Sequence, residues 1–423
     1  QTADSGYIIV GAIYNSTSNW DILLIKTDND GEISWNKSYG GNSLELSNFV
    51  QQSSDGGFII CGYTQSFGTG DNDAYLLKTD SLGNLLWTRT YGEPNSNDAA
   101  VCVRETNNGG YVFCGYLSGI YCGSIRTFYL ARIDLYGDTL WTRTYSGLNQ
   151  EAGGRIVYQT PDSGFVVLGT SHSSNNDHNI CLFKTDFSGN IQWAKTYGGP
   201  YIDAGISMEI SDNGYVLLGR TLSYSPYDVC LIKTNFFGDT LWTKNYGLSF
   251  MSGNSFSLSN DGGYSILSTY MPTTLIDSGI IYLVKTDSFG NSPCISRNFP
   301  ITASAISLRD TITATIVDSG GAIGIPLYTT GSGTIIADPC IINDTTNPQM
   351  DNFFVYPNPS DGHFRVNARG VFRVYNALGE MIYNEELSGQ ETVIDLSQKS
   401  TGVYYLLLIN DSRIFTKKLF IQK

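Results

Sequence analysis

The chain has 423 residues, more than one compact core usually holds, so we expect at least two domains. Its formal net charge of −14 argues against nucleic acid and against an anionic membrane surface as partners. Only 15% of the residues are charged, whereas 46 are glycine and 28 are tyrosine, which is typical of β-rich extracellular proteins.

Six copies of one unit of about 50 residues fill positions 1–293. An aromatic residue after a glycine marks the copies at steps of 51, 53, 54, 50 and 49: Tyr7, Phe58, Tyr111, Phe165, Tyr215 and Tyr264. A fixed period of this length indicates repeats that bury their apolar faces only by stacking on one another.

The second copy shows how one unit folds into four strands. A short strand at 48–54 precedes a DGG turn, where glycine accommodates positive backbone φ. Nearly continuous apolar strands follow at 57–64 and 74–80, which indicates burial on both faces. A D-x-x-G turn then leads to a strand at 85–92 that carries a tryptophan. Antiparallel four-stranded units that repeat radially form a β-propeller, and we predict about six blades.

Two recurring patterns have a structural interpretation. Trp87 and Tyr91, four residues apart, lie on one face of their strand, so we interpret them and their counterparts as packing between blades. The Lys-Thr-Asp sequence recurs with few changes, and a residue present in nearly every blade is normally scaffold. We expect its aspartate to cap the following turn and its lysine stem to be partly covered.

Both ends of the repeat region are incomplete. The first copy lacks its first strand, and the sixth lacks its tryptophan strand. Because the chain starts at Gln1 rather than Met, we expect roughly 20–30 further residues and a secretion signal upstream, which would complete both end blades. The alternative is that segment 296–340 supplies the closing strand.

Candidate functional residues are sparse. An acidic residue follows the tyrosine of the tryptophan strand by six or seven positions in four copies: Glu45, Asp98, Glu151 and Asp203. A ring of carboxylates near the propeller axis would hold Ca²⁺ or a polyol, or supply a paired acid and base. The alternative is that each acid accepts backbone N–H bonds in its own loop. His172 and His178 are interpreted as solvated loop residues, and we expect no cofactor or metal beyond that possible Ca²⁺.

Six of the eight cysteines fall into two groups. Cys61 with Cys114, and Cys181 with Cys230, occupy equivalent repeat positions among apolar residues, so we interpret them as small buried side chains. Cys294 and Cys340 bracket a Thr/Ser/Gly-rich connecting segment, 294–350, that ends in a linker, and we predict a disulfide between them.

From residue 351 onward, alternating strands separated by Gly, Asn and Asp turns predict a small β-sandwich. The fold class is therefore all-β, with a propeller over 1–293 and this sandwich over 351–423. Residues 351–423 resemble the type A C-terminal sorting domain of the bacterial type IX secretion system. The positions that carry the resemblance are Tyr356, Pro357, Asn358, Pro359, Gly362, Gly379, Gly402, Tyr404, Lys417 and Lys418.

This resemblance implies export across the outer membrane of a Gram-negative bacterium, with the secretion machinery as a partner. The product is then released or attached to the cell surface. The repeats likewise resemble secreted propeller-type repeats that precede such tails, a resemblance that implies a fold but no activity. No run of 18 apolar residues occurs, so we expect no transmembrane segment.

Two functional classes remain open. The first is a non-catalytic binding or adhesion propeller whose loops contact a glycan or a surface protein. The second is a secreted carbohydrate-active hydrolase or lyase with carboxylate chemistry at the propeller axis. Sparse histidines, no nucleophile motif and nearly interchangeable copies favour binding, because an enzyme site usually breaks repeat symmetry.

Overall fold

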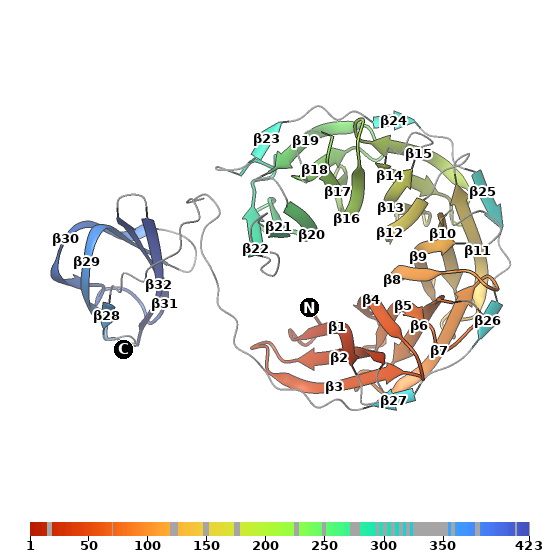
Figure 1. The fold of residues 1–423 in the computed structure, drawn as a ribbon, viewed down its shortest axis with the longest axis horizontal. Helices are drawn as coiled ribbons and strands as arrows, with labels where there is room; N and C mark the ends of the chain where they lie inside the picture. Colours follow the sequence, from red (N-terminus) through yellow and green to blue (C-terminus); the bar gives the residue numbers. More distant parts are fainter. Residues whose placement is uncertain are drawn as a thin grey trace. The chain divides into compact units, whose positions relative to one another are not determined.

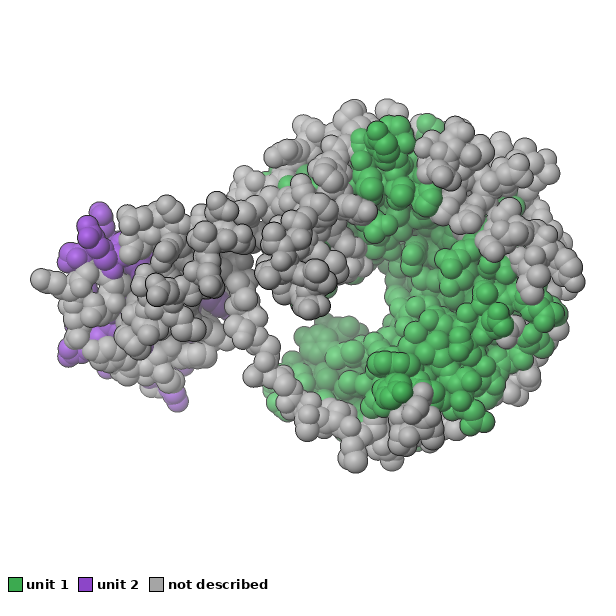
Figure 2. All heavy atoms as spheres, in the orientation of Figure 1, with its two compact units in different colours: residues 1–331 green, residues 332–423 purple. Residues whose placement is uncertain are grey.

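The computed structural model describes all residues except 15–18, 70, 119–125, 147–151, 173–177, 224–227, 248–250, 271–279, 293–295, 299–302, 306–308, 313–315, 319–321, 325–353, 357–359, 377–380, 411–412 and 423. The described residues form β-strands and turns, which confirms the all-β prediction. No helix long and apolar enough to cross a membrane occurs in this part of the chain. The chain divides into two compact units, Gln1–Gly331 and Ser332–Lys423 (Figure 2).

Unit 1 contains six antiparallel sheets, each built from the consecutive strands of one repeat. The first three sheets contain β1 (Tyr7–Tyr14), β2 (Trp20–Thr27) and β3 (Ile33–Gly40); β4 (Glu45–Gln52), β5 (Phe58–Thr64), β6 (Asp73–Thr79) and β7 (Leu85–Gly92); β8 (Ala99–Glu105), β9 (Tyr111–Ser118), β10 (Arg126–Ile133) and β11 (Thr139–Ser146). The next three contain β12 (Ala152–Gln159), β13 (Phe165–His172), β14 (His178–Thr185) and β15 (Ile191–Tyr197); β16 (Asp203–Ser211), β17 (Gly214–Thr221), β18 (Asp228–Thr234) and β19 (Thr240–Tyr246); β20 (Met251–Leu258), β21 (Tyr264–Tyr270) and β22 (Ile280–Lys285).

The six sheets follow one another around a common centre in chain order (Figure 1). Of the four strands of a repeat in the second to fifth sheets, the first lies nearest the centre and the tryptophan strand lies farthest from it. Among the described residues, the first sheet has no counterpart of β4, and the sixth has no counterpart of β7. Both incomplete ends were expected from the repeat pattern.

Five short strands from the predicted connecting segment lie at the periphery of unit 1. These peripheral strands are β23 (Ser296–Asn298), β24 (Ala303–Ala305), β25 (Arg309–Ile312), β26 (Ile316–Asp318) and β27 (Ala322–Gly324). They pair antiparallel with β19, β15, β11, β7 and β3 respectively, so the chain returns past the sheets in reverse order (Figure 1). The described part of this segment thus adds an outermost strand to the first five sheets.

Neighbouring sheets are joined by the recurring tryptophan and tyrosine. Each tryptophan ring lies 5.8 to 6.3 Å from the aromatic ring that begins the second strand of the next repeat. Each tyrosine hydroxyl donates a hydrogen bond of 2.6 to 2.7 Å to a glycine carbonyl in the D-x-x-G or N-x-x-G turn of the next repeat. The donors are Tyr39, Tyr91, Tyr145, Tyr197 and Tyr246. The interpretation of both residues as packing between repeats is confirmed.

The Lys-Thr-Asp sequence has the structural role that its recurrence indicates. In the second sheet, the Asp80 carboxylate accepts the backbone N–H groups of Leu82 and Asn84 at 2.9 and 2.8 Å and so caps the turn. The buried ammonium of Lys78 contacts Asp55 of the preceding turn at 2.8 Å and donates to the Thr79 carbonyl at 3.0 Å. This pattern confirms the scaffold interpretation.

The innermost strands carry a β-bulge that positions side chains at the centre of unit 1. In the second to sixth sheets the register with the next strand shifts at this bulge, which leaves one residue unpaired. The unpaired residues are Asn48, Val101, Arg155, Ile206 and Asn254. A glycine opposes the bulge in most sheets because the backbones approach closely; a Cβ on Gly115 would lie 1.9 Å from the Ala99 carbonyl oxygen.

Unit 2 contains one five-stranded sheet. Its strands are β28 (Phe354–Tyr356), β29 (His363–Tyr375), β30 (Met381–Asp395), β31 (Gly402–Asn410) and β32 (Arg413–Ile421). The long strand β29 pairs with β30 along its length, with β28 near its start and with β31 near its end. Alternate residues of these strands, including Phe364, Val366, Phe372 and Val374, form the core.

Candidate functional site

Two of the predicted acidic residues are fully buried beside the loop of their own sheet. The Glu45 carboxylate accepts hydrogen bonds from the Gly41 amide at 2.7 Å and the Thr64 hydroxyl at 2.6 Å. The Asp203 carboxylate accepts the Gly199 amide at 2.7 Å. In both cases the acid accepts a backbone N–H group within its own loop, which is the alternative that sequence spacing left open.

Asp98 is likewise fully buried. It accepts the Glu93 amide at 2.9 Å, the Ser118 amide at 3.2 Å and the Ser96 hydroxyl. Burial nevertheless raises the pKa of Asp98 to about 6, because removing the carboxylate from water costs more than these hydrogen bonds recover. Glu151 lies outside the described residues.

These acids do not assemble into one site. Glu45 begins β4, Asp98 directly precedes β8 and Asp203 begins β16, so each belongs to a different sheet. None of the three lines the central pocket described below. Within the described ranges, no group of three or more His, Cys, Asp or Glu side chains is placed to hold a metal ion.

The four repeat cysteines that we interpreted as small buried side chains are confirmed as such. Cys61, Cys102, Cys114, Cys181 and Cys230 are buried and unpaired thiols. The predicted disulfide partners Cys294 and Cys340 lie outside the described residues, so their pairing stays a prediction. His178 begins β14 and pairs with His172, the last residue of β13, so the prediction that both lie in a loop is wrong.

A pocket of about 580 Å³ lies at the centre of unit 1, where the space-filling view is hollowed (Figure 2). We call it the axial pocket. Its lining comes from the innermost strands β4, β8, β12, β16 and β20, together with one residue of β17: Asn48, Phe49, Val101, Arg104, Arg155, Ile156, Tyr158, Ala204, Gly205, Ile206, Ser207, Glu209, Arg220, Ser255 and Phe256. Four of the bulge residues are among them, because a bulge redirects the unpaired side chain.

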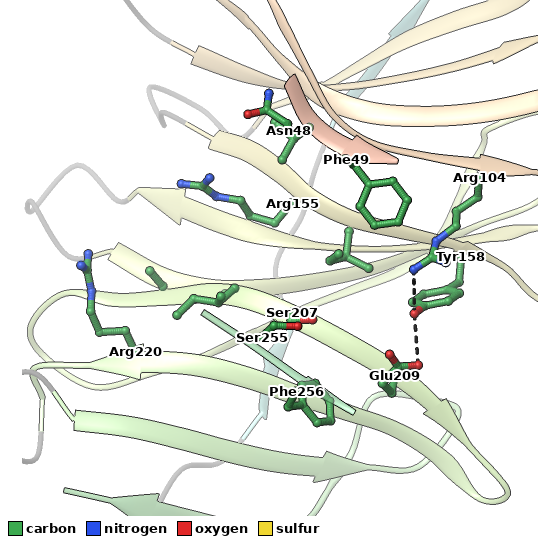
Figure 3. A pocket seen from close by; sticks show the side chains of 15 residues that line it. Asn48, Phe49, Arg104, Arg155, Tyr158, Ser207, Glu209, Arg220, Ser255 and Phe256 are labelled. Atoms are coloured by element: carbon green, nitrogen blue, oxygen red, sulfur yellow. Dashed lines mark hydrogen bonds between the residues drawn. The ribbon is translucent and has the colours of Figure 1, made fainter. Parts of the chain in front are cut away.

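One side of the axial pocket carries a chain of hydrogen bonds across three sheets (Figure 3). The Arg104 guanidinium donates to the Tyr158 hydroxyl at 2.9 Å, and this hydroxyl donates to the Glu209 carboxylate at 3.1 Å. Arg104 also lies over the rings of Phe49 and Tyr158, 4.8 and 4.3 Å from their centroids. Burial raises the pKa of Glu209 above its ordinary value.

The other side of the axial pocket carries two more arginines. Arg155 is the bulge residue of β12, and Arg220 follows the recurring glycine on β17; Figure 3 shows both extending away from the Arg104–Tyr158–Glu209 chain. Among the described lining residues, Glu209 is the one carboxylate, against three arginines. The described lining therefore carries a net positive charge, within a chain whose net charge is −14.

Two variable positions of the repeat mark the axial pocket in the sequence, whereas the recurring acidic residues do not. Each bulge residue lies ten positions before the aromatic residue of its repeat, or nine in the fifth. The residues at this position are Asn, Val, Arg, Ile and Asn, and three positions later stand Gln51, Arg104, Tyr158, Glu209 and Ser257. Both positions change from copy to copy while the scaffold residues recur, and such a departure from repeat symmetry indicates a specific site.

The described residues of the predicted sorting signal lie in or beside the sheet of unit 2. Gly362 has φ of +112°, and a Cβ there would lie 2.6 Å from Ser397 Cα, so the position requires glycine. The buried Tyr404 donates to the Ser400 carbonyl at 2.8 Å. Tyr356, Gly402, Lys417 and Lys418 lie on strands, whereas Pro357, Asn358, Pro359 and Gly379 lie outside the described residues.

Comparison with known proteins identifies the tail. A search of curated proteins finds no match to the chain. Residues 354–422 match the family model described as the secretion system C-terminal sorting domain. The C-terminal part of the chain is therefore a type IX secretion sorting domain, which indicates a partner in the secretion machinery and a secreted or outer-membrane surface protein.

Proposed function

We propose that the repeats form a β-propeller that binds a ligand in the axial pocket without catalysing a reaction, and that the sorting domain delivers it to the cell exterior. Antiparallel sheets repeated around a common centre support the propeller. The match of residues 354–422 supports the delivery. The peripheral strands support a rigid scaffold, because they extend five sheets by hydrogen-bonded pairing.

The observation that carries this proposal is where the repeats differ. The tryptophan, the inter-sheet tyrosine and the turn-capping aspartate recur, and each has a packing or hydrogen-bonding role. The side chains that the bulges direct into the axial pocket do not recur. A binding site on a symmetric scaffold needs such differences, because a ligand without that symmetry contacts each sheet differently.

The lining residues favour binding over hydrolysis. Those that the structure describes include no histidine and no cysteine, and their one carboxylate, Glu209, is hydrogen-bonded to Tyr158. Hydrolysis of a glycoside ordinarily uses two carboxyl groups that flank the scissile bond. The described acids with that potential, Glu45, Asp98 and Asp203, accept hydrogen bonds in their own loops. The alternative is a secreted carbohydrate-active hydrolase or lyase.

A glycan-array screen of the full chain, with product analysis for every bound glycan, tests the proposal. Val101→Trp fills the axial pocket from the bulge of β8, and Leu86→Trp adds the same ring at an exposed position of β7. We expect binding without turnover that Val101→Trp abolishes and Leu86→Trp preserves. Turnover would establish the enzyme alternative, and binding that survives Val101→Trp would place the site elsewhere.

A further inference from the structure

The charge of the axial pocket is distributed unevenly. Arg104 and Glu209 are joined through the Tyr158 hydroxyl, so one positive and one negative charge lie on the same side and largely compensate each other. Arg155 and Arg220 lie on the opposite side (Figure 3). Arg155 and Arg220 therefore supply the other two positive charges of the described lining.

Arginine side chains such as Arg155 and Arg220 suit an anionic group. The guanidinium is planar and remains protonated, and its parallel N–H groups match the two oxygens of a carboxylate. Arg155 is exposed and Arg220 is partly buried, so the first is open to solvent and the second lies deeper. A cation such as Ca²⁺ is disfavoured beside two positive charges.

The remainder of the lining suits a small carbohydrate. The partly exposed Phe49 provides apolar surface, and Asn48, Ser207 and Ser255 provide groups that hydrogen-bond to hydroxyls. A volume of about 580 Å³ is in the range of sites for small ligands rather than for a folded protein partner. A sugar ring matches this lining, because it has apolar C–H faces and carries hydroxyl groups around its edge.

We propose that the axial pocket binds a carboxylated sugar, with its carboxylate at Arg155 and Arg220 and its ring against Phe49. This inference rests on the proposed function, because it names the ligand class of the same pocket. It adds that recognition depends on the negative charge of the ligand. The Arg104–Tyr158–Glu209 chain then forms the opposite wall and supplies hydrogen-bonding groups to the sugar hydroxyls.

Isothermal titration of the full chain tests the inference with a galacturonate trisaccharide and with the same trisaccharide after its carboxyl groups are reduced to alcohols. We expect the reduced sugar to bind at least about tenfold more weakly, because a charge-assisted hydrogen bond is lost at each contact. Arg155→Gln and Arg220→Gln should each weaken binding of the charged sugar by about tenfold or more. High salt should also weaken it, since the pocket is open to solvent.

Arg126→Gln is the matched control, because Arg126 is an exposed arginine of β10 that lies outside the axial pocket and stacks on Tyr116. It should leave the affinity unchanged. Thermal unfolding of each variant excludes loss of structure as the cause of lost binding.

The outcomes separate the two proposals. Equal affinity for the charged and reduced sugars, together with insensitivity to both arginine substitutions, would overturn the anionic ligand class. If Val101→Trp still abolished that binding, the axial pocket would stand as the binding site. Inorganic phosphate and an aspartate-rich peptide serve as competitors, and preferential binding of either would overturn the assignment to a carboxylated sugar. No binding of any of these probes would also overturn it.

Discussion

Replacing Tyr91 with phenylalanine removes one hydroxyl from the boundary between the second and third sheets. The hydroxyl is fully buried and donates to the Gly137 carbonyl at 2.7 Å. Burial also holds the pKa of Tyr91 well above its ordinary value, so the hydroxyl remains a neutral donor. The ring packs 4.9 Å from Phe113 of the third sheet, and the substitution keeps that contact.

The expected loss is the hydrogen bond together with the cost of leaving the Gly137 carbonyl without its donor. For a buried group this is about 1–3 kcal/mol, and we take about 2 kcal/mol. At about 2.1 cal/mol/K per residue for the unfolding entropy, 2 kcal/mol lowers the melting temperature of a unit of this size by about 3 °C. The same substitution at the other inter-sheet tyrosines should have a similar effect.

The assay is urea unfolding followed by tryptophan fluorescence, with Tyr201→Phe as the control. Tyr201 is 63% exposed, so loss of its hydroxyl should change the free energy of unfolding by less than about 0.5 kcal/mol. A Tyr91→Phe variant as stable as the Tyr201→Phe variant would refute the reasoning. That result would mean that the hydrogen bond between Tyr91 and Gly137 makes no net contribution to the free energy of unfolding.

Three further predictions follow from burial, close packing and the peripheral strands. The pKa of about 6 for Asp98 in the folded state lies above its unfolded value near 3.9, so the folded state binds this proton more tightly. Protonated Asp98 therefore adds about 3 kcal/mol to the free energy of unfolding below pH 3.9, and this contribution is lost as pH rises through 6. Asp98→Asn should remove that part of the pH dependence of urea unfolding, and an unchanged profile would contradict it. Gly115→Ala should destabilise by about 2 kcal/mol or more, whereas Gly11→Ala, whose Cβ meets nothing within 4 Å, should cost under about 1 kcal/mol; equal costs would contradict the close approach at the bulge. Replacing residues 296–324 with a Gly/Ser segment of equal length should increase hydrogen exchange at the outer edges of β7, β11, β15 and β19, and unchanged exchange would show that the pairing is not maintained.

The scaffold was predictable because its determinants are local and repeated. A DGG turn, an apolar run and a tryptophan strand specify four strands, and six copies make each assignment redundant. The packing roles of Trp87 and Tyr91 also follow from their spacing on one face of a strand. The incomplete first and sixth sheets follow from the same pattern.

The peripheral strands were not predictable in their arrangement. Each has only three or four residues, too short for an alternating pattern, and each pairs with a strand far away in the sequence. Their β-forming composition was visible, but composition does not specify a partner. Contacts between distant segments depend on the assembled sheets.

The candidate site was anticipated at the centre of the repeats but with different residues. Glu45, Asp98 and Asp203 occupy equivalent positions of the repeat and accept hydrogen bonds in their own loops. Recurrence at equivalent positions is expected for scaffold residues as well as for a ring of ligands, so it does not distinguish the two. The residues that reach the axial pocket depend on the β-bulges, which shift the register by one residue. The sequence indicates these residues only through the variation among the copies at the bulge position, for example Arg155 in the fourth repeat and Ile206 in the fifth.

A crystal structure of the full chain with the galacturonate trisaccharide tests the central claim most directly. The account predicts electron density for the sugar in the axial pocket, with a carboxylate within hydrogen-bonding distance of Arg155 or Arg220. Sugar bound instead at the loops between the second and third strands, with the axial pocket containing only solvent, would contradict it.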